Sequence, residues 1–403
     1  MRRLRVLLSD GSGVTSRQVA TALGRAGHEV EAVNPPGPTL MAETRWVNKL
    51  HPVPFPGDDP LGWCDAVAEI VRSGRFDVLL ATQEQVAVLT VEASRFRSLG
   101  VGLAVPEFAS LQRVQDKISA VSTLRAAGLP QPPSQVVRSA SELLAVEPPV
   151  YVKAAVSTAS RGVHFADSAA ALEALAPKLS FEDGALVQQP VDGRLVMVQS
   201  VFDRGRLVAW HAAERVRSDR NGGGTHKLGL CLPEVRDHLV QLGDHLKWHG
   251  ALSMDAVYTS DGPFYIDINP RIVEPINASL SGVDLVGALL RISLGEHPEV
   301  QEDPVPGTAT HQLLLAVLSS AAEGRLAIAR ELWQAITHTG SYRGSVEELL
   351  PPRGDLRTVV PLVFVAGKLL YSPGKARKTV SGAVGNYALT AQGWRDLQAR
   401  YRS

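Results

Sequence analysis

The residues best suited to chemistry lie in one short segment, Phe264–Arg271, which reads FYIDINPR. Alternate residues of a strand share one face, so Asp267, Asn269 and Arg271 should point together, with Pro270 marking the end of the strand. A carboxylate and an amide oxygen suit Mg²⁺, which prefers oxygen ligands, and a neighbouring arginine can bind phosphate or a developing oxyanion. The segment therefore predicts a site for a metal-bound phosphate ligand.

A second carboxylate, Asp255, lies inside the apolar segment Ala251–Val257. The turn signal Thr259–Gly262 follows this segment and should bring Asp255 opposite Asp267 in a hairpin. A carboxylate in an apolar strand is costly to bury and usually needs a charged partner or a metal. We therefore predict Asp255, Asp267 and Asn269 as metal ligands, with acids at solvated strand ends as the alternative.

Two lysines precede these acids along the chain. Lys117 follows Asp116 at the start of a predicted helix, and Lys153 ends the predicted strand Val150–Lys153. The loop Ala155–Gly162 has small hydroxyl residues, which can hold phosphate together with backbone N–H groups. Either lysine alone is explained as well by a solvated surface, because lysine is mostly exposed. Their order relative to the acids favours a phosphate-binding site.

Composition and length describe an ordinary folded protein. The chain has 403 residues, of which 45% are hydrophobic and 20% charged, and its formal net charge is +0. At roughly 100–200 residues per domain, this length predicts two to four structural units. The charge balance gives no reason to expect nucleic acid or an anionic membrane as a partner. With only Cys64 and Cys231 and no apolar stretch of about 18 residues, we expect a soluble, cytoplasmic protein without a disulfide framework.

The order of predicted strands and helices divides the chain into four units. Alternating strands and helices over 1–112 predict an N-terminal α/β domain with a parallel sheet. A small α+β unit is expected over 113–190, and a unit with hairpins and the acidic strands over 191–303. The last unit, 304–403, is predicted as α+β, with a helix near Gln312–Ala322 and strands near Val359–Val365 and Lys368–Tyr371.

These ordered segments resemble the ATP-grasp superfamily, and the resemblance covers about Arg113–Asp284. It rests on VQDKISA, YVKAAVSTASRGV, LVQQPVDG, the Gly-rich loop RSDRNGGGTHK and GALSMDAVYTSDGPFYIDINPR. The DINPR ending is most similar to the branch of carboxylate–amine and L-amino-acid ligases. The resemblance implies an ATP-grasp fold, in which two α+β subdomains clasp ATP. The N-terminal α/β domain precedes these subdomains in the chain, and the C-terminal α+β unit follows them.

The resemblance also implies cofactors and roles. The cofactors would be ATP and Mg²⁺, with Mn²⁺ as the alternative ion, and the loop Arg217–Lys227 would be a lid. Residues would act as follows: Lys117, Lys153, Ser160, Gly162, Gln188, Gln189 and Val191 in ATP binding; Asp255, Asp267 and Asn269 in metal binding; Arg271 in catalysis; Arg215, Arg217, His226, Lys227 and Glu274 at the substrate or in the lid.

The sequence departs from the family pattern at several of these positions. The loop after Lys153 keeps only Gly162, and the hinge Gln188–Pro190 lacks the usual acidic–aromatic pair. Apolar residues around Leu195–Val196 stand where a ribose-binding carboxylate is common. Asp267 replaces the commoner glutamate, and its shorter side chain should draw the strand closer to the metal.

The implied function is ligation of a carboxylate, an amino acid or related small acid, to an amine through an acyl phosphate, with release of ADP and phosphate. Two alternatives stay open: another ATP-grasp chemistry, carboxylation or ligation of an acid to a thiol or carrier, and a nucleotide-binding regulatory protein without turnover. The expected partners are small molecules, and a homodimer and a carrier protein stay open. The segment 372–403 has six basic residues against one acid, net +5, and is read as a solvated face, with a subunit or carrier contact as the alternative.

Overall fold

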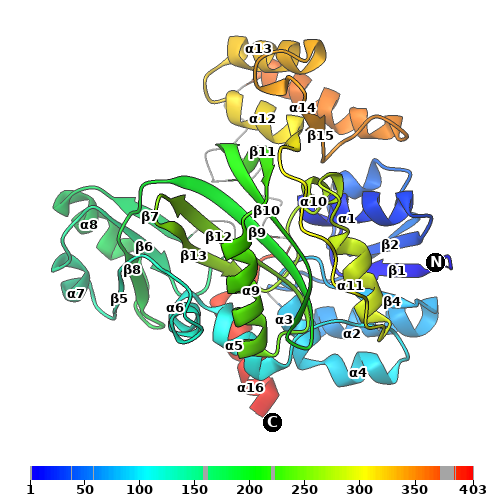
Figure 1. Cartoon of the computed structure of the whole chain (residues 1–403). Coiled ribbons are helices and arrows are strands. Elements are labelled where there is room, and N and C mark those ends of the chain that lie inside the picture. The colour runs from blue at the N-terminus through cyan, green and yellow to red at the C-terminus, as the bar shows by residue number, and fades with distance from the viewer. Residues whose placement is uncertain are drawn as a thin grey trace.

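Figure 1 shows the computed structural model of the chain, which describes residues 2–37, 39–57, 59–157, 162–218, 223–372, 385 and 387–402. The described residues form a parallel sheet near the N-terminus, a small antiparallel sheet and a larger central sheet. The two smaller sheets flank the central one in the picture. The helices between residues 313 and 371 lie above it, and the last helix, near the C-terminus, lies below it.

The N-terminal sheet has the strand order β3-β2-β1-β4, and every pairing in it is parallel. This confirms the α/β prediction for the start of the chain. The apolar segment Val101–Ala104 would continue the predicted alternation as a further strand, but this prediction is wrong, because only a single bridge between Val78 and Gly102 forms there. The elements are β1 (Arg5–Leu8), α1 (Val14–Arg25), β2 (Glu29–Asn34), η1 (Leu40–Ala42), β3 (Lys49–Pro52), α2 (Pro60–Gly74), β4 (Val78–Leu80), α3 (Val86–Val91), α4 (Ala93–Ser98) and α5 (Phe108–Gln115).

The small sheet, ordered β5-β8-β6-β7, is antiparallel and has a hydrophobic core of its own. Ser139 and Ser168 begin its two helices, since each hydroxyl accepts a backbone N–H of the first turn. A separate core makes this part a compact body attached to the central sheet. Its elements, with the helix that precedes it, are α6 (Lys117–Ala126), β5 (Ser134–Val137), α7 (Ala140–Leu144), β6 (Val150–Ala154), β7 (Val163–Ala166), α8 (Ala169–Leu175), η2 (Ala176–Lys178) and β8 (Ala185–Gln188).

The central sheet has the order β13-β12-β9-β10-β11-β14-β15. Its first hairpin turns at Arg204–Gly205, near where the sequence predicted it, and the second turns at Thr259–Gly262. The strands are long because apolar residues continue through them and pack on the neighbouring helices. The elements are β9 (Arg194–Asp203), β10 (Arg206–Ser218), β11 (Gly224–Leu230), α9 (Pro233–Leu246), β12 (Gly250–Thr259), β13 (Gly262–Asn269), α10 (Ile276–Leu280) and α11 (Leu285–Ser293).

The C-terminal unit is mainly helical, and its short strands extend the central sheet. The helix predicted near Gln312–Ala322 is confirmed, but the strands predicted over Val359–Val365 and Lys368–Tyr371 are wrong. One helix covers both, because its apolar residues pack on two neighbouring helices and Pro361 falls in its first turn, where proline is tolerated. The elements are β14 (Ala309–His311), α12 (Leu313–Ser320), α13 (Arg325–Thr337), η3 (Gly340–Tyr342), β15 (Val346–Glu347), η4 (Leu356–Thr358), α14 (Val359–Tyr371) and α16 (Ala391–Arg402).

The last helix, α16, packs against the N-terminal domain. The Trp394 and Phe108 rings lie 5.5 Å apart, and Arg400 pairs with Glu92 at 2.9 Å. Arg395 pairs with Asp183 of the small sheet at 3.0 Å. Arg395 and Arg400 of this segment therefore make contacts within the chain; Lys375, Arg377 and Lys378 lie outside the described residues.

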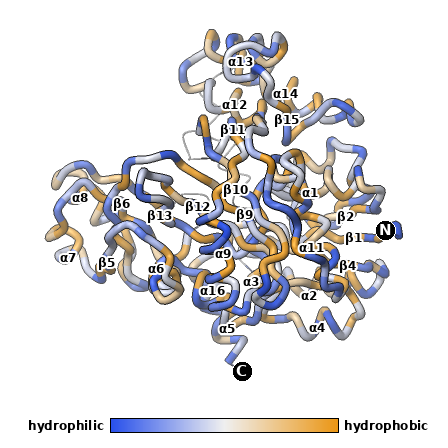
Figure 2. The backbone as a smooth tube through the Cα atoms, in the orientation of Figure 1, coloured by the Kyte–Doolittle hydropathy of each residue, from blue (hydrophilic) through white to orange (hydrophobic). Residues whose placement is uncertain are grey.

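Buried apolar residues from the N-terminal domain, α5, α9, the central strands and α16 form one large core. Figure 2 shows hydrophobic and hydrophilic stretches interleaved over all parts of the molecule, so no lobe consists of one kind alone. None of the helices in the described ranges combines the length and the apolar character that crossing a membrane requires.

Candidate functional site

The two acidic strands pair as the sequence predicted. In the antiparallel pair β12–β13, Asp255 lies opposite Asp267, and Ser253 lies opposite Asn269. A bulge follows directly after the two acids, and such bulges redirect side chains at functional sites. The hairpin turn closes at Gly262, whose φ of +102° favours glycine. Two carboxylates and an amide thus gather at one end of the hairpin.

Lys117 neutralises one of the two acids. Its Nζ lies 2.9 Å from Oδ1 of Asp267, and α6 holds it there because Asp116 accepts the backbone N–H groups of Ile118 and Ser119. Burial alone would raise the pKa of Asp267, but Lys117 and Lys153 outweigh it and lower that pKa. The Asp267 carboxylate is therefore ionised and available as an oxygen ligand.

Lys153 lies on the small sheet and faces the same hairpin. Its Nζ donates to Oε1 of Gln188 and to the carbonyl oxygen of Ile266, both at 2.7 Å. Gln188 is close because β8 pairs with β6. Neither partner is a carboxylate, so burial dominates and lowers the pKa of Lys153 to about 8. This lysine would gain charge beside an anionic ligand.

A pocket opens between these elements. It is lined by Lys117, Asp267 and Asn269 together with Gln115, Ser157 and Glu84. The Oγ of Ser157 and the Oε1 of Gln115 are buried and have no hydrogen-bond partner among the described residues. Buried polar groups are normally paired, so these two atoms indicate a polar ligand in the pocket.

Two arginines complete the charged surroundings of the hairpin. Arg215 of β10 pairs with Asp255 at 2.5 Å, and Nε of Arg271 pairs with Glu84 at 3.1 Å. The partner of Arg271 therefore comes from the N-terminal domain and not from the neighbouring acids Asp267 or Glu274. Its side chain is 11% exposed, so the guanidinium is largely buried beside Glu84, which lines the pocket.

Most of the described residues of the predicted lid lie on strands. The prediction of one loop over Arg217–Lys227 is wrong, because β10 continues to Ser218 and β11 begins at Gly224. Arg217 makes two 2.7 Å hydrogen bonds with Glu331 of the C-terminal unit. This pair and the contact of the Tyr342 ring with His226 give these strand residues partners in the C-terminal unit.

His226 and Lys227 are buried strand residues. The His226 ring lies 4.8 Å from the ring of Tyr342, and burial lowers the pKa of His226 to about 4, which keeps it neutral. Lys227 pairs with Glu274 at 2.5 Å and with Glu348 at 2.6 Å. These three charged groups meet in the interior, outside the described lining of the pocket.

The remaining predicted ATP-binding positions lie around the small sheet. The carbonyl of Gly162 accepts the N–H of Ala154 at 2.8 Å, and a Cβ on Gly162 would come within 2.7 Å of Ser157. The N–H of Gln189 donates to the carbonyl of Pro133 at 2.9 Å. Val191 follows at the junction to β9, and Ser160 lies outside the described residues.

Sequence reasoning missed Glu84 and Glu348. Glu84 had a signal: the polar run Thr82–Gln85 directly follows the buried strand β4, and ligands bind at the carboxyl ends of parallel strands. Glu348 had none, because two adjacent glutamates before two leucines are most simply read as exposed. Leu389, which also lines the pocket, comes from a segment that carries no motif.

The donor set is consistent with a magnesium ion that a ligand helps to hold. No group of three or more His, Cys, Asp or Glu that could bind a metal is found in the part of the chain that the structure describes. Two carboxylates and one amide are too few for a closed cage, but Mg²⁺ is commonly held by one or two carboxylates plus substrate phosphates. Asp255, Asp267 and Asn269 therefore fit Mg²⁺ only together with a phosphate ligand.

The part of the chain that carries most of the site residues also matches a known protein family. Residues 114–275 match the family model of the ATP-grasp domain. The fold is similar to that of an L-amino acid ligase from Bacillus licheniformis, with a TM-score of 0.60 and 16% identity over 78% of this chain and 81% of that one.

Two further solved structures share the fold. The biotin carboxylase domain of the 2-oxoglutarate carboxylase from Hydrogenobacter thermophilus gives a TM-score of 0.61 at 16% identity, over 77% of this chain and 75% of that chain. N5-carboxyaminoimidazole ribonucleotide synthetase from Thermotoga maritima gives 0.58 at 15% identity, over 77% and 81%. At these identities the likeness extends to the fold alone.

The low pKa of Lys153 leads to a prediction about ATP binding. Near pH 8 this lysine is only partly charged, and a triphosphate beside it would raise its pKa. ATP binding should therefore take up a fraction of a proton, and affinity should fall as the pH rises from 7 to about 9. Calorimetry at pH 8 in buffers of different ionisation enthalpy measures this uptake.

The matched comparison is between the two lysines. Both Lys117→Met and Lys153→Met should weaken ATP binding, because each removes a cation. Only Lys153→Met should abolish proton uptake, since the pKa of Lys117 is raised and that lysine is charged beforehand. Uptake that persists without Lys153, or is absent in the unmodified protein, would contradict the assignment.

Proposed function

Because residues 114–275 form an ATP-grasp domain, we propose that this protein is an ATP-dependent carboxylate–amine ligase. It would join a carboxylate, an amino acid or related small acid, to an amine, and release ADP and phosphate. The observation that carries the proposal is the register of β12 and β13, which places Asp255 opposite Asp267. Asn269 lies two residues after Asp267 on the same strand, and Arg271 follows two residues later.

The first step would be transfer of the γ-phosphoryl group of ATP to a carboxylate oxygen. The bond between that phosphorus and the ADP oxygen breaks, and an acyl phosphate forms. Such a transfer needs mainly positioning and charge neutralisation. Lys117 and Lys153 would hold the phosphates, and the partly desolvated pocket would strengthen both contacts.

Asp255, Asp267 and Asn269 would hold Mg²⁺ together with the phosphates. When bound, this ion supplies neutralisation of charge on the phosphate oxygens. The fold neighbour from Hydrogenobacter thermophilus was solved with MgADP, which supports the same pair of cofactors here. Asp267 could reach the ion without losing Lys117, because Lys117 contacts only its Oδ1.

The second step would be attack of the amine on the carbonyl carbon. The new C–N bond replaces the C–O bond to phosphate, phosphate leaves, and the amine gives up a proton. Arg271 would lie beside the carboxylate and stabilise the oxyanion that develops, because its fork can hold two oxygens. Arg271 would leave Glu84 when the substrate binds, because the carboxylate of the substrate can replace the carboxylate of Glu84 as its partner.

Other reactions differ in the acceptor. Carboxylation would use bicarbonate as the acid, ligation to a thiol or carrier would use sulfur as the nucleophile, and a regulatory protein would bind ATP without turnover. ADP and phosphate release should be measured with pooled amino acids, with bicarbonate, with a thiol and with ATP alone. The proposal requires release that depends on both a carboxylate and an amine, with an amide product found by mass spectrometry.

The outcomes of this screen separate the candidates. Release that needs bicarbonate or a thiol would replace the proposal with one of the other chemistries. ATP binding without release under any condition would favour the regulatory protein. We expect the cytoplasm as the compartment, since both described cysteines are free and a reducing environment suits them.

The metal assignment predicts the effect of two substitutions. Asp267→Asn and Asn269→Ala should each lower Mg²⁺-dependent ADP formation by about a hundredfold while the protein stays folded, because the first removes the negative charge of a ligand and the second removes an oxygen ligand. Asp261→Asn, at the exposed turn of the same hairpin, is the control and should keep full activity. Normal turnover in either ligand variant at limiting Mg²⁺ would show that the ion is bound elsewhere.

Arg271 should serve the reaction more than ATP binding. In Arg271→Lys the charge remains but the fork is lost, so kcat and kcat/KM should fall alike, by about tenfold or more, with a nearly unchanged KM for ATP. Arg236→Lys, on the exposed side of α9, is the control. If Arg271→Lys keeps its kcat and only raises the KM for ATP, Arg271 is a binding residue and not a catalytic one.

A further inference from the structure

The loop that follows the acidic strand carries Arg271 and has a strained backbone. Glu274, three residues after Arg271, has a φ of +41°, a left-handed conformation that a residue with a Cβ rarely adopts. Such a conformation persists only when the surroundings hold it in place. The contacts of Glu274 therefore show what determines the shape of this loop.

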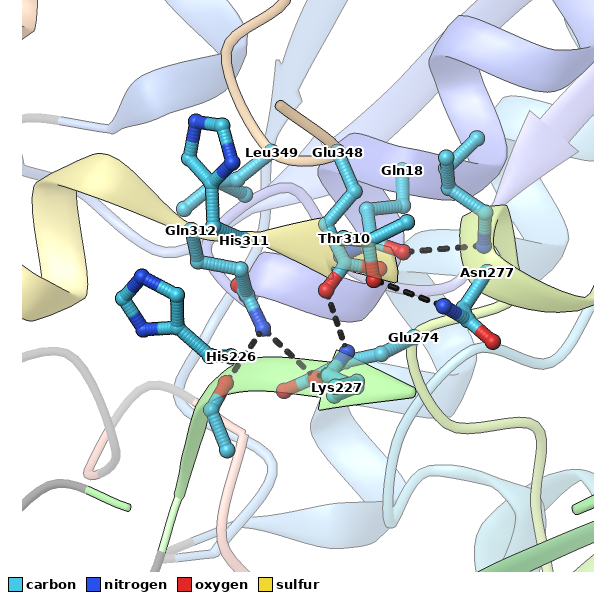
Figure 3. Close-up of polar contacts among 12 residues, drawn as sticks. Gln18, His226, Lys227, Glu274, Asn277, Thr310, His311, Gln312, Glu348 and Leu349 are labelled. Atoms are coloured by element: carbon cyan, nitrogen blue, oxygen red, sulfur yellow. Dashed lines mark hydrogen bonds and ion pairs between the residues drawn. The ribbon is translucent and has the colours of Figure 1, made fainter. Parts of the chain in front are cut away.

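The Glu274 carboxylate is held by buried partners from the central sheet and from the C-terminal unit. Its Oε2 accepts from Nζ of Lys227 at 2.5 Å and from Nε2 of Gln312 at 2.7 Å. Lys227 in turn lies 2.6 Å from Oε1 of Glu348, as Figure 3 shows. Glu274 is 9% exposed, and the other three are 2% exposed or less.

The charges of this network depend on one another. Burial alone would lower the pKa of Lys227, but the carboxylates of Glu274 and Glu348 outweigh it and raise that pKa. Burial raises the pKa of Glu348 to about 7. Glu348 is one of two carboxylates that hold the buried ammonium of Lys227, and its loss would leave a buried donor short of a partner, which is unfavourable. Removal of Glu348 would therefore disturb the contact between Lys227 and Glu274.

The backbone of the same loop is fixed from the N-terminal domain. The N–H of Glu274 donates to Oγ1 of Thr15 at 3.3 Å, and the N–H of Ile276 donates to Oε1 of Gln18 at 3.1 Å. On the central sheet, Nε2 of Gln199 donates to the carbonyl of Glu274 at 3.2 Å. The loop is thus the place where the N-terminal domain, the central sheet and the C-terminal unit meet.

We propose that Glu348 is a positioning residue: through Lys227 and Glu274 it fixes the loop that carries Arg271, and so sets where the guanidinium lies in the pocket. Its kinetic consequence rests on the proposed function, whereas its effect on the loop does not. The C-terminal unit thereby contributes to the reaction without touching the substrate.

The first test measures the loop itself. Hydrogen exchange at the amides of Glu274 and Ile276 should be on the order of tenfold faster in Glu348→Ala than in the unmodified protein. Glu348→Gln, which keeps a hydrogen-bond acceptor but no charge, should fall between the two. Leu350→Ala opens a cavity in the same segment without touching Lys227 and is the control for general destabilisation; it should leave these two amides unchanged.

The second test measures turnover with the same variants. Glu348→Ala should lower kcat by about tenfold with an unchanged KM for ATP, because misplacement of a reacting group costs rate and not ATP affinity. In an Arg271→Lys background the same change should add little, since both act on one group. Additive losses, or equal losses in Leu350→Ala, would overturn the proposal.

The two tests separate the two proposals. If no carboxylate and amine give ADP, the ligase function fails while hydrogen exchange still decides the role of Glu348. If turnover occurs but the Glu274 and Ile276 amides exchange normally in the Glu348 variants, only the positioning role is wrong. If Glu348→Ala does not fold, hydrogen exchange in Glu348→Gln decides instead. The proposal then requires the amides of Glu274 and Ile276 to exchange faster in Glu348→Gln than in the unmodified protein.

Discussion

The site depends on the close approach of two like charges. Asp255 and Asp267 are directly opposite each other on adjacent strands, a position at which like charges repel. The arrangement is stable in the absence of a ligand because each acid has its own cation, Arg215 for the first and Lys117 for the second. These cations come from β10 and α6, so the hairpin fixes how the surrounding elements must pack. The two carboxylates can bind a divalent cation, and that cation neutralises charge on a triphosphate that binds beside it.

A second set of charges, most of them buried, joins the C-terminal unit to β10, β11 and the loop that follows β13. Lys227 lies between Glu274 and Glu348, and Arg217 pairs with Glu331 of the C-terminal unit. Buried ion pairs contribute less to stability than to the choice of one arrangement, because their desolvation cost offsets much of the attraction. In this chain they determine where the C-terminal unit contacts the end of the β10–β11 hairpin. His226 and Lys227, which sequence alone suggested as part of a mobile lid, are thus buried strand residues.

The parts of the fold and site that were predictable depend on local patterns. The turn Thr259–Gly262 and the apolar runs beside it determine the register of Asp255 and Asp267, so the sequence predicted that pair correctly. The helical state of Val359–Tyr371 was not predictable from a run of β-branched residues, because packing on α12 and α13 overrides the strand propensity. Glu84 and its partner Arg271 are 187 positions apart in the sequence. Glu348 and its partner Lys227 are 121 positions apart (348 − 227). No local pattern encodes contacts at such separations.

The central claim is that a carboxylate is activated as an acyl phosphate, and isotope transfer tests it most directly. A carboxylate substrate labelled with ¹⁸O should be incubated with ATP, Mg²⁺ and the amine, and the released phosphate examined by mass spectrometry. The account predicts one ¹⁸O atom in each released phosphate, because the carboxylate oxygen that accepts the phosphoryl group leaves with it. Unlabelled phosphate, or release of AMP and pyrophosphate in place of ADP and phosphate, would contradict the account.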